Sequence, residues 1–447
     1  MGIVRRTPVV ALVATAVSMC LCAGRASAQA APSTEELLRR IDGLEAQIAE
    51  LRAIVNGAAS APGPAAATGA STASPAATRD VTFGVSLDAY YMFNPRFPIG
   101  RVNLLRAYDV LSNNFSLNQA SVVVESAADP GAGRRFGGRL DLQWGMATET
   151  VQGNLMNEPR PWVYRNVFQA YGTYVAPVGS GLKIDFGKWA GSLGYEGNYT
   201  KDQMNYSRSY WFNFLPFYHM GARVNYQLSD AVALNYWVTN GAQNTEAFNN
   251  FKDQFVGVVV QPAKAVTWTA QYYFGQEHPD VQTIESPGFP TLPTQPGLSV
   301  TPVTPYFTGK LHIFDSYASW QLSPSTTLAV EGDYVINRNP APAIDSRVSG
   351  GSVYARRQLS PRSAVAARAE YLRDRGGLFT GVTQSVKEAT VTYDFTLAEG
   401  FLVRSEWRRD LASTPFFFTH DAGVLDAAQD TATIGVIWWW GTKRNAW

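Results

Sequence analysis

Apolar and polar residues alternate with a period of two along most of the chain from Asp80 to Trp447. The stretches VTFGVSLDAYY (81–91) and GGRLDLQWG (137–145) show this alternation clearly. Such segments are nine to fourteen residues long. This is the length that a tilted β-strand needs to cross a bilayer, with one face toward lipid and the other toward an interior. The pattern therefore predicts transmembrane β-strands.

The connections between these strands alternate strictly between short and long. Short connections share a form, as in QLSDAVAL at 227, QLSPSTTL at 321 and QLSPRSAV at 358. The predicted strands, sixteen in number, are 81–93, 115–127, 134–146, 167–177, 181–189, 220–228, 231–240, 251–262, 264–274, 309–322, 325–336, 350–360, 363–373, 385–397, 400–411 and 430–441. This asymmetry predicts an all-β transmembrane barrel with short periplasmic turns and long external loops. A soluble β-sandwich or propeller would also alternate, but it has no reason to keep its long connections at one end.

The N-terminal part of the chain has a different pattern. Residues 1–28 read as a signal peptide, with Arg5 and Arg6, an apolar stretch and a small-residue cleavage site. Residues 33–56 carry a heptad seam that predicts a short periplasmic coiled-coil helix, with a single amphipathic helix lying on a surface as the alternative. Residues 57–79 form an Ala/Pro/Ser-rich linker, and residues 80–447 form the barrel. The predicted location is the outer membrane of a Gram-negative-type bacterium.

Composition narrows the possible chemistry. Cys20 and Cys22 both lie in the predicted signal, so a disulfide, a catalytic thiol and a cysteine metal site are not expected. The signal holds three of the 37 basic residues and none of the 36 acidic residues, so the remainder carries a charge of about −2, unlike a nucleic-acid binder. The four histidines form no closely spaced Ser-His-acid group, and phosphate-loop and zinc motifs are missing. We expect no enzyme, cofactor or metal site, with an outer-membrane lipase as the alternative.

The connection 190–219 is longer than a hairpin requires, and it is rich in aromatic residues. A sixteen-strand barrel is wide enough for an aqueous channel, so this loop is predicted to fold inward and narrow the channel. We expect its rings to pack against the wall, among them Tyr206, Tyr210, Trp211 and Phe217. Arg208 would either pair with a wall carboxylate or face the constriction. His219, at the base of the loop, is expected to hold the loop by a hydrogen bond.

The period of two also nominates side chains that face the lumen. The predicted pore-lining charges are Arg139, Asp141, Arg223, Arg356, Arg368, Glu370, Arg404, Glu406 and Arg408, and Asp315, Glu331 and Asp333 face inward as well. These charges could set a transverse field that sorts ions by sign. Alternatively, they form a solvated ladder of ion pairs that stiffens the wall.

Several motifs resemble the β-barrel porin-2 (OmpL-like) family of bacterial outer membranes. The matching residues are Arg106, Tyr108 and Asp109; Phe115, Leu117, Asn118 and Ala120; Ser207, Arg208 and Ser209; and Pro216, Phe217, His219 and Gly221. The resemblance implies a channel-forming outer-membrane porin and says little about its solute. The added coiled coil is loosely similar to that of some sugar- and anion-selective porins.

Two functional hypotheses follow. The first is a porin that lets ions, sugars or other small hydrophilic nutrients diffuse passively, embedded in outer-membrane lipid as a homotrimer. The second is a structural tether, in which the barrel is an anchor and the coiled coil binds peptidoglycan or another envelope protein. Deletion of residues 33–56 distinguishes them, because a porin keeps its conductance and a tether loses its function.

Overall fold

The computed structural model describes residues 81–152, 158, 160–285, 298–302, 309–338, 344–443 and 446–447. The predicted signal peptide (1–28), coiled-coil helix (33–56) and linker (57–79) lie outside the described residues.

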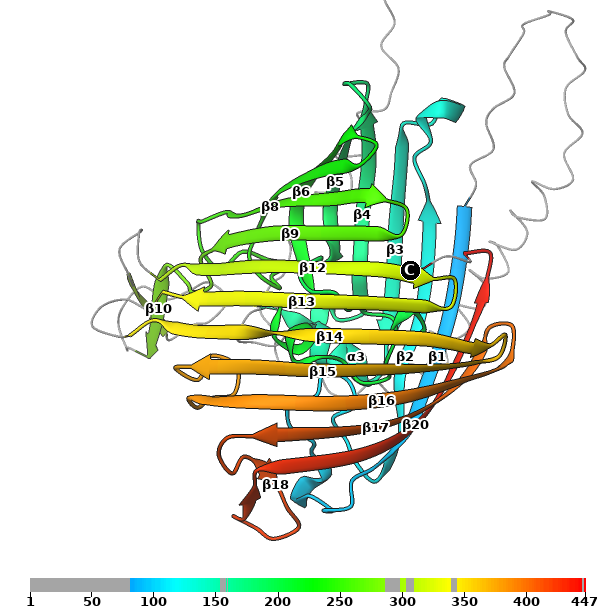
Figure 1. Cartoon of the computed structure of the whole chain (residues 1–447). Helices are drawn as coiled ribbons and strands as arrows, with labels where there is room; N and C mark the ends of the chain where they lie inside the picture. Colours follow the sequence, from blue (N-terminus) through cyan, green and yellow to red (C-terminus); the bar gives the residue numbers. More distant parts are fainter. Residues whose placement is uncertain are drawn as a thin grey trace, which may run out of the picture. The chain divides into compact units, whose positions relative to one another are not determined.

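The described chain forms a closed antiparallel barrel of sixteen strands (Figure 1). These are β1 (Val81–Phe93), β2 (Asn114–Ser126), β3 (Phe136–Trp144), β4 (Val167–Ala176), β5 (Leu182–Ala190), β6 (Tyr218–Ser229), β7 (Val232–Thr239), β8 (Asp253–Ala263), β9 (Val266–Gly275), β12 (Leu311–Ser323), β13 (Thr326–Asn337), β14 (Ser346–Ser360), β15 (Ser363–Arg375), β16 (Gln384–Ala398), β17 (Phe401–Ala412) and β20 (Ala428–Gly441). Strand β1 pairs with both β2 and β20, which closes the barrel. All sixteen predicted strands are confirmed, with bounds shifted by a few residues.

Smaller elements lie in the connections. They are the 3₁₀ helices η1 (Ile99–Arg101), η2 (Pro130–Ala132) and η3 (Thr200–Asp202), the helices α3 (Met146–Val151), α4 (Pro161–Tyr164) and α5 (Tyr210–Phe214), and the paired strands β10 (Val281–Glu285) with β11 (Leu298–Pro302) and β18 (Phe417–Phe418) with β19 (Leu425–Asp426). Within the described ranges, each helix is too short or too polar to cross a membrane.

Burial alternates along the strands as the sequence pattern predicts. On β17, Arg404, Glu406 and Arg408 are buried inward, while Trp407 points outward and is 44 % exposed. Trp438 and Trp440 on β20 also point outward, with ring centroids 4.4 Å apart. Large apolar and aromatic side chains on the outer face of a closed barrel are typical of a surface that contacts lipid and its interfaces.

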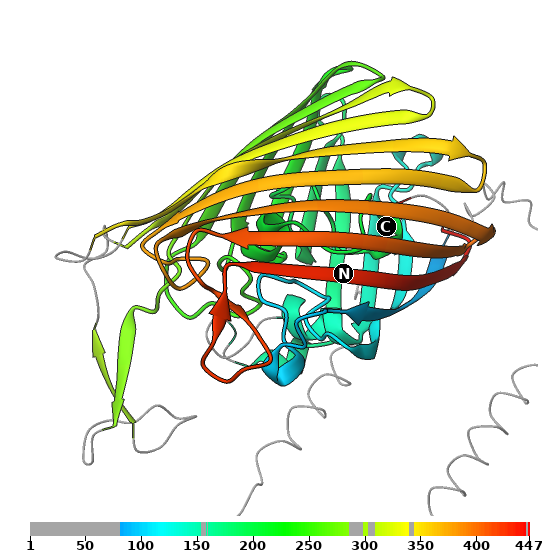
Figure 2. The ribbon, with the colours of Figure 1, turned by 60° about the horizontal axis from the view of Figure 1, so that its bottom comes forward.

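The recurring QLS connections are tight turns at one end of the barrel, visible as short hairpins in Figure 2. In each turn a glutamine side chain donates a hydrogen bond to the carbonyl two residues later: Gln227 to Ser229 (2.6 Å), Gln321 to Ser323 (2.6 Å) and Gln358 to Ser360 (2.7 Å). The strand register shifts at the same places. The shared sequence therefore encodes a shared bulged turn. We call this the short-turn end, and the opposite end the long-loop end.

Candidate functional site: an inward loop across the lumen

The connection between β5 and β6, residues 191–217, runs inside the barrel and is called the inward loop here. Its ends lie close together, since a Cβ on Gly191 would come 2.2 Å from the carbonyl oxygen of Pro216. Glycine is required at that position for the two segments to meet. Gly194 has a φ of +86°, a left-handed conformation that glycine adopts without strain.

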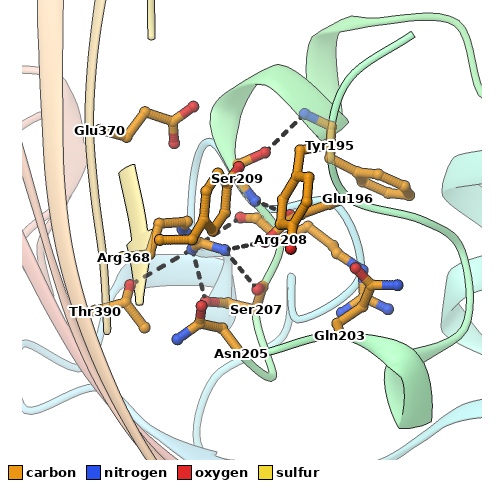
Figure 3. A network of polar contacts seen from close by, with 12 residues as sticks. Tyr195, Glu196, Gln203, Asn205, Ser207, Arg208, Ser209, Arg368, Glu370 and Thr390 are labelled. Atoms are coloured by element: carbon orange, nitrogen blue, oxygen red, sulfur yellow. Dashed lines mark hydrogen bonds and ion pairs between the residues drawn. The ribbon is translucent and has the colours of Figure 1, made fainter. Parts of the chain in front are cut away.

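Arginines of the barrel wall bind carbonyl groups of the inward loop. Arg368 on β15 donates to the carbonyl of Ser207 (2.9 Å) and pairs with Glu196 (2.7 Å), as Figure 3 shows. Arg404 on β17 donates to three loop carbonyls, those of Thr200 (3.0 Å), Gln203 (2.9 Å) and Asn205 (2.9 Å). Guanidinium groups suit this task because each one presents five N–H donors in a fixed plane.

Carboxylates of the same wall bind the loop's N–H groups. Glu370 on β15 accepts from the N–H groups of Tyr210 (2.7 Å) and Trp211 (3.1 Å), at the start of α5. Glu406 on β17 accepts from those of Tyr206 (2.5 Å) and Ser207 (2.9 Å). Buried backbone groups need such partners, and hydrogen bonds to charged groups contribute about 1.5–3 kcal/mol each. The loop backbone is thus held in place by wall side chains.

The opposite wall holds the same loop through its side chains. The Tyr206 hydroxyl donates to Asp88 on β1 (2.7 Å). The Tyr199 hydroxyl donates to Asp141 on β3 (2.6 Å). The inward loop therefore spans the lumen from β1–β3 to β15–β17.

Arg208 occupies neither of the two places expected from the sequence. Its side chain is fully buried and donates to the carbonyls of Gly197 (3.0 Å), Tyr206 (2.8 Å) and Asn198 (3.0 Å) within its own loop. It makes no ion pair with the described residues. The prediction that it pairs with the wall or faces the constriction is wrong, because the loop's own carbonyls satisfy its donors.

The loop's aromatic rings are buried against the wall. Tyr206 packs on β20, where a Cβ on Gly435 would come 2.3 Å from its ring. The Tyr210 hydroxyl donates to Asp410 (2.9 Å), and Trp211 is fully buried in the main apolar cluster. Phe217 is only half-buried and packs on Phe212 of the same loop, with 5.1 Å between the ring centroids. Burial raises the pKa of the hydroxyls of Tyr206 and Tyr210 well above the ordinary value, so both remain proton donors.

His219 does not hold the inward loop. It belongs to β6, and its Nδ1 lies 3.2 Å from the carbonyl oxygen of Gly241, in the connection between β7 and β8. Its ring lies near Trp237 and Tyr273. The expected role is corrected: this histidine packs within the wall and fixes the neighbouring connection.

The connection 94–113 also enters the lumen, which the sequence pattern did not predict. Arg106 pairs with Asp410 on β17 (2.7 Å) and with Asp109 (3.1 Å), and both arginine and aspartates are buried. The Tyr108 hydroxyl donates to Asn198 (2.6 Å), and the Arg208 guanidinium lies 5.1 Å from the centre of the Tyr108 ring. The available signal was the Arg-x-Tyr-Asp motif, whose residues meet the inward loop.

Trp447 reaches the inward loop from the end of the chain. Its backbone N–H donates to Asp202 (3.0 Å), and its ring lies 5.4 Å from that of Tyr199. A Cβ on Gly84 would come 2.3 Å from the indole, so β1 carries glycine where the ring packs. No pattern in the sequence indicates this contact.

The predicted lining charges fall into two groups. Arg368, Glu370, Arg404, Glu406 and Arg408 face inward but are covered by the inward loop, each at most 6 % exposed. For these five, a water-exposed lining is the wrong description, because the loop has taken their hydrogen bonds. Asp141 is also buried, bonded to Arg139 and Tyr199.

The second group keeps its cations partly exposed. The side-chain exposures of cation and acid are 12 % and 0 % for Arg139–Asp141, 16 % and 0 % for Arg223–Asp185, 28 % and 3 % for Arg356–Asp394, and 44 % and 0 % for Lys183–Asp185. In each of these four inward-facing pairs the cation is more exposed than the carboxylate, which is covered. One further group, Asp315, Glu331 and Asp333, brings three buried carboxyls together and is the single cluster of metal-ligand type among the described residues.

The chain was compared with protein families, curated proteins and solved structures. The family model described as "Putative beta-barrel porin-2, OmpL-like" matches residues 80–438. Similar solved structures include OmpT of Vibrio cholerae (12 % identity, covering 80 % of this chain and 97 % of that chain, TM-score 0.47) and an anion-selective porin from Comamonas acidovorans (7 % identity, 80 % and 99 %, TM-score 0.49). A search of curated proteins gives no match. The chain belongs to the β-barrel porin-2, OmpL-like family of outer-membrane porins.

Proposed function

We propose that this protein is a passive-diffusion channel for small hydrophilic solutes, narrowed by the inward loop. The observation that carries this proposal is the attachment of the loop to both sides of the lumen, through Arg404 and Glu406 on β17 and Asp141 on β3. Because the loop is attached to both walls, it stays in one position across the lumen and narrows the barrel there. Solutes would pass through the space that the loop leaves.

The side chains that line this space support the proposal that the solutes are small and hydrophilic. The inward-facing side chains with accessible surface include Lys183, Arg223 and Arg356. Charged groups along a water-filled path favour ions and polar solutes and disfavour apolar ones. The proposed assembly is a homotrimer in outer-membrane lipid, as is usual for large porins.

The experiment is single-channel recording of the purified full-length protein in a planar bilayer. Discrete conductance steps, arriving in groups of three, support the trimeric porin. A matched variant in which residues 198–213 are replaced by a short Gly/Ser connection should conduct more per step, and its insertion is checked independently. A silent bilayer, with insertion shown independently by protease protection or fluorescence, contradicts the proposal. Equal conductance of the two proteins would show that the inward loop does not limit flow.

A further inference from the structure

Three inward-facing carboxyl groups gather on β12 and β13. Asp315 and Asp333 face each other across the strand pair, and Glu331 lies one inward position along β13. One oxygen from each residue lies within 4.8 Å of the others, and all three residues are buried, at 3 %, 6 % and 5 % exposure. Their arrangement brings three acidic groups to one point of the wall.

These carboxyls lack the cation that other buried acids of the lumen have. Asp394 pairs with Arg404 (2.7 Å), and Asp410 pairs with Arg106 (2.7 Å). Asp315, Glu331 and Asp333 take part in no ion pair with any residue in the described part of the chain. Arg368 on nearby β15 is already bound to Glu196 and Glu388.

Two of the three carboxyls are oriented by neutral donors. Asp315 accepts from the N–H of Gly194 (3.2 Å) and the amide of Gln271 (2.6 Å). Glu331 accepts from the N–H of Tyr195 (3.0 Å) and the hydroxyl of Tyr354 (2.7 Å). Each oxygen keeps a second lone pair.

Asp333 provides the independent sign of a ligand. Both of its carboxylate oxygens are buried, and neither accepts from an N–H or hydroxyl donor of the described residues; the polar group beside it is the Asp315 carboxyl, which can share a hydrogen bond with it only when one of the two is protonated. A buried carboxylate without partners is costly, and it needs a cation or a proton to compensate its charge. Its oxygens lie in the same cluster as those of Asp315 and Glu331.

We propose that Asp315, Glu331 and Asp333 bind a hard divalent cation of the calcium class. Carboxylate oxygens are the ligands that calcium prefers, and its flexible coordination accepts ligands that also hold other hydrogen bonds. Asp333 contributes its two free oxygens, and the other carboxyls contribute their remaining lone pairs. This inference concerns the wall of the barrel and does not depend on conduction.

The bound ion would connect the inward loop to the wall through ligands that the loop already touches. The N–H groups of Gly194 and Tyr195 bond to two of the three carboxyls. A Cβ on Gly194 would come 3.0 Å from Glu331 Oε1, so a glycine lets the loop approach this closely. Cation binding should therefore stabilise the loop in its inward position.

The test is terbium luminescence on the detergent-solubilised full-length protein after treatment with a chelator. Tyr195 and Tyr354 adjoin the cluster, with ring centroids 4.8 Å apart, so tyrosine excitation should sensitise a bound Tb³⁺ ion. Competition with Ca²⁺ and Mg²⁺ then gives their affinities. The expected result is one saturable site that Ca²⁺ competes for.

The test variant is Asp333→Asn, which removes no acceptor of an N–H or hydroxyl donor. The control is Asp430→Asn on β20, an acid outside the cluster that pairs with Arg409. Asp333→Asn should weaken Ca²⁺ binding by about tenfold or more, and Asp430→Asn should leave it unchanged. If Asp333→Asn fails to fold, Asp315→Asn serves instead, because asparagine can still accept from Gly194. The proposal is overturned if the original protein has no saturable site, or if all variants bind Ca²⁺ with equal affinity. Either result would indicate that the three carboxyls are neutralised by shared protons.

Discussion

Arg408 on β17 donates a hydrogen bond across 2.6 Å to the backbone carbonyl of Arg208, whose own guanidinium is occupied within the inward loop. The same stretch of loop backbone gives two N–H groups to Glu406 and two to Glu370. Wall arginines and wall glutamates thus bind the carbonyl and N–H groups of one segment. Side chains supply the partners that a neighbouring strand would supply in a sheet.

Arg404→Ala should loosen the inward loop. The change removes the donor of three loop carbonyls, while Asp394 keeps Arg356 as its partner (2.6 Å). Loss of one member of a buried charged network costs about 3–5 kcal/mol of the free energy of unfolding. We expect a lower thermal unfolding temperature and noisier single-channel currents.

The control for this change is Arg409→Ala on the same strand. Arg409 points outward, with its side chain 46 % exposed, and pairs with Asp430 (3.4 Å). It should behave like the original protein in both measurements. Equal effects of the two substitutions would mean that loss of any β17 arginine disturbs the barrel, and that the loop contacts of Arg404 are unimportant.

Gly435→Ala tests the packing of Tyr206 against β20. The new methyl group would come 2.3 Å from the Tyr206 ring, so the ring has to move and its bond to Asp88 weakens. We expect destabilisation of about 1–3 kcal/mol in thermal or denaturant unfolding, as for other overpacked sites. Gly332→Ala on β13 is the matched control, because its methyl group would meet nothing closer than 3.9 Å. If both variants unfold alike, the ring contact does not restrict position 435.

The barrel was predictable because each strand repeats one physical rule. Trp407 lies on the outer face of β17 and its neighbour Arg408 lies on the inner face. This alternation appears in the sequence as apolar and polar residues with a period of two. The QLS turns were recognisable because one glutamine–carbonyl bond recurs at three places. Local pattern and local geometry coincide in these elements.

The site was predictable only in part, because its contacts join segments that are far apart in the chain. Period two identifies Arg404 as inward-facing, but it cannot show that the backbone of Asn205 occupies its donors. Likewise, the burial of Arg208 depends on three carbonyls brought together by the fold of the loop. The sequence shows which charges enter the lumen, and only the folded loop decides which of them meet water.

Two acids in the long connections should give opposite dependences of stability on pH. Burial, and then the neighbouring Asp253, raise the pKa of the Glu277 carboxyl well above its ordinary value. The folded protein therefore holds this proton more tightly than the unfolded chain, and stability falls as the pH rises from about 4.5 toward the raised pKa. Glu277→Gln should flatten this decline, while its side-chain oxygen still accepts from the N–H of Ala242.

Glu246 provides the comparison. Its hydrogen bonds with Arg160 lower its pKa, so its contribution is present above the unfolded-state pKa and disappears as the pH falls through the lowered folded value. Glu246→Gln should cause a small loss at neutral pH and none in acid, because the pair is exposed. Thermal unfolding midpoints of the original protein and both variants, measured across this pH range, show whether Glu277 and Glu246 change stability in opposite directions. A Glu277→Gln profile parallel to that of the original protein would contradict the argument.

The exposed cations of the lumen should make the channel prefer anions. Lys183 and Arg356 are the most exposed of the inward-facing pairs, while their acids are at most 3 % exposed. Glu125, which keeps 25 % exposure, lies between Arg139 and Lys443. At Lys183 and Arg356 an ion in the open space therefore meets a cationic group before it meets the paired carboxylate, and that raises the local concentration of anions.

Reversal potentials in a salt gradient measure this preference. The original protein should show the sign of anion selectivity, more strongly at low salt, where screening is weak. The double variant Lys183→Gln/Arg356→Gln should shift the potential toward zero, and it should still fold because Asp185 keeps Arg223 and Asp394 keeps Arg404. Lys264→Gln, an exposed change in the short turn after β8, should leave the potential unchanged. Cation selectivity in the original protein would mean that groups other than these exposed pairs determine which ions pass.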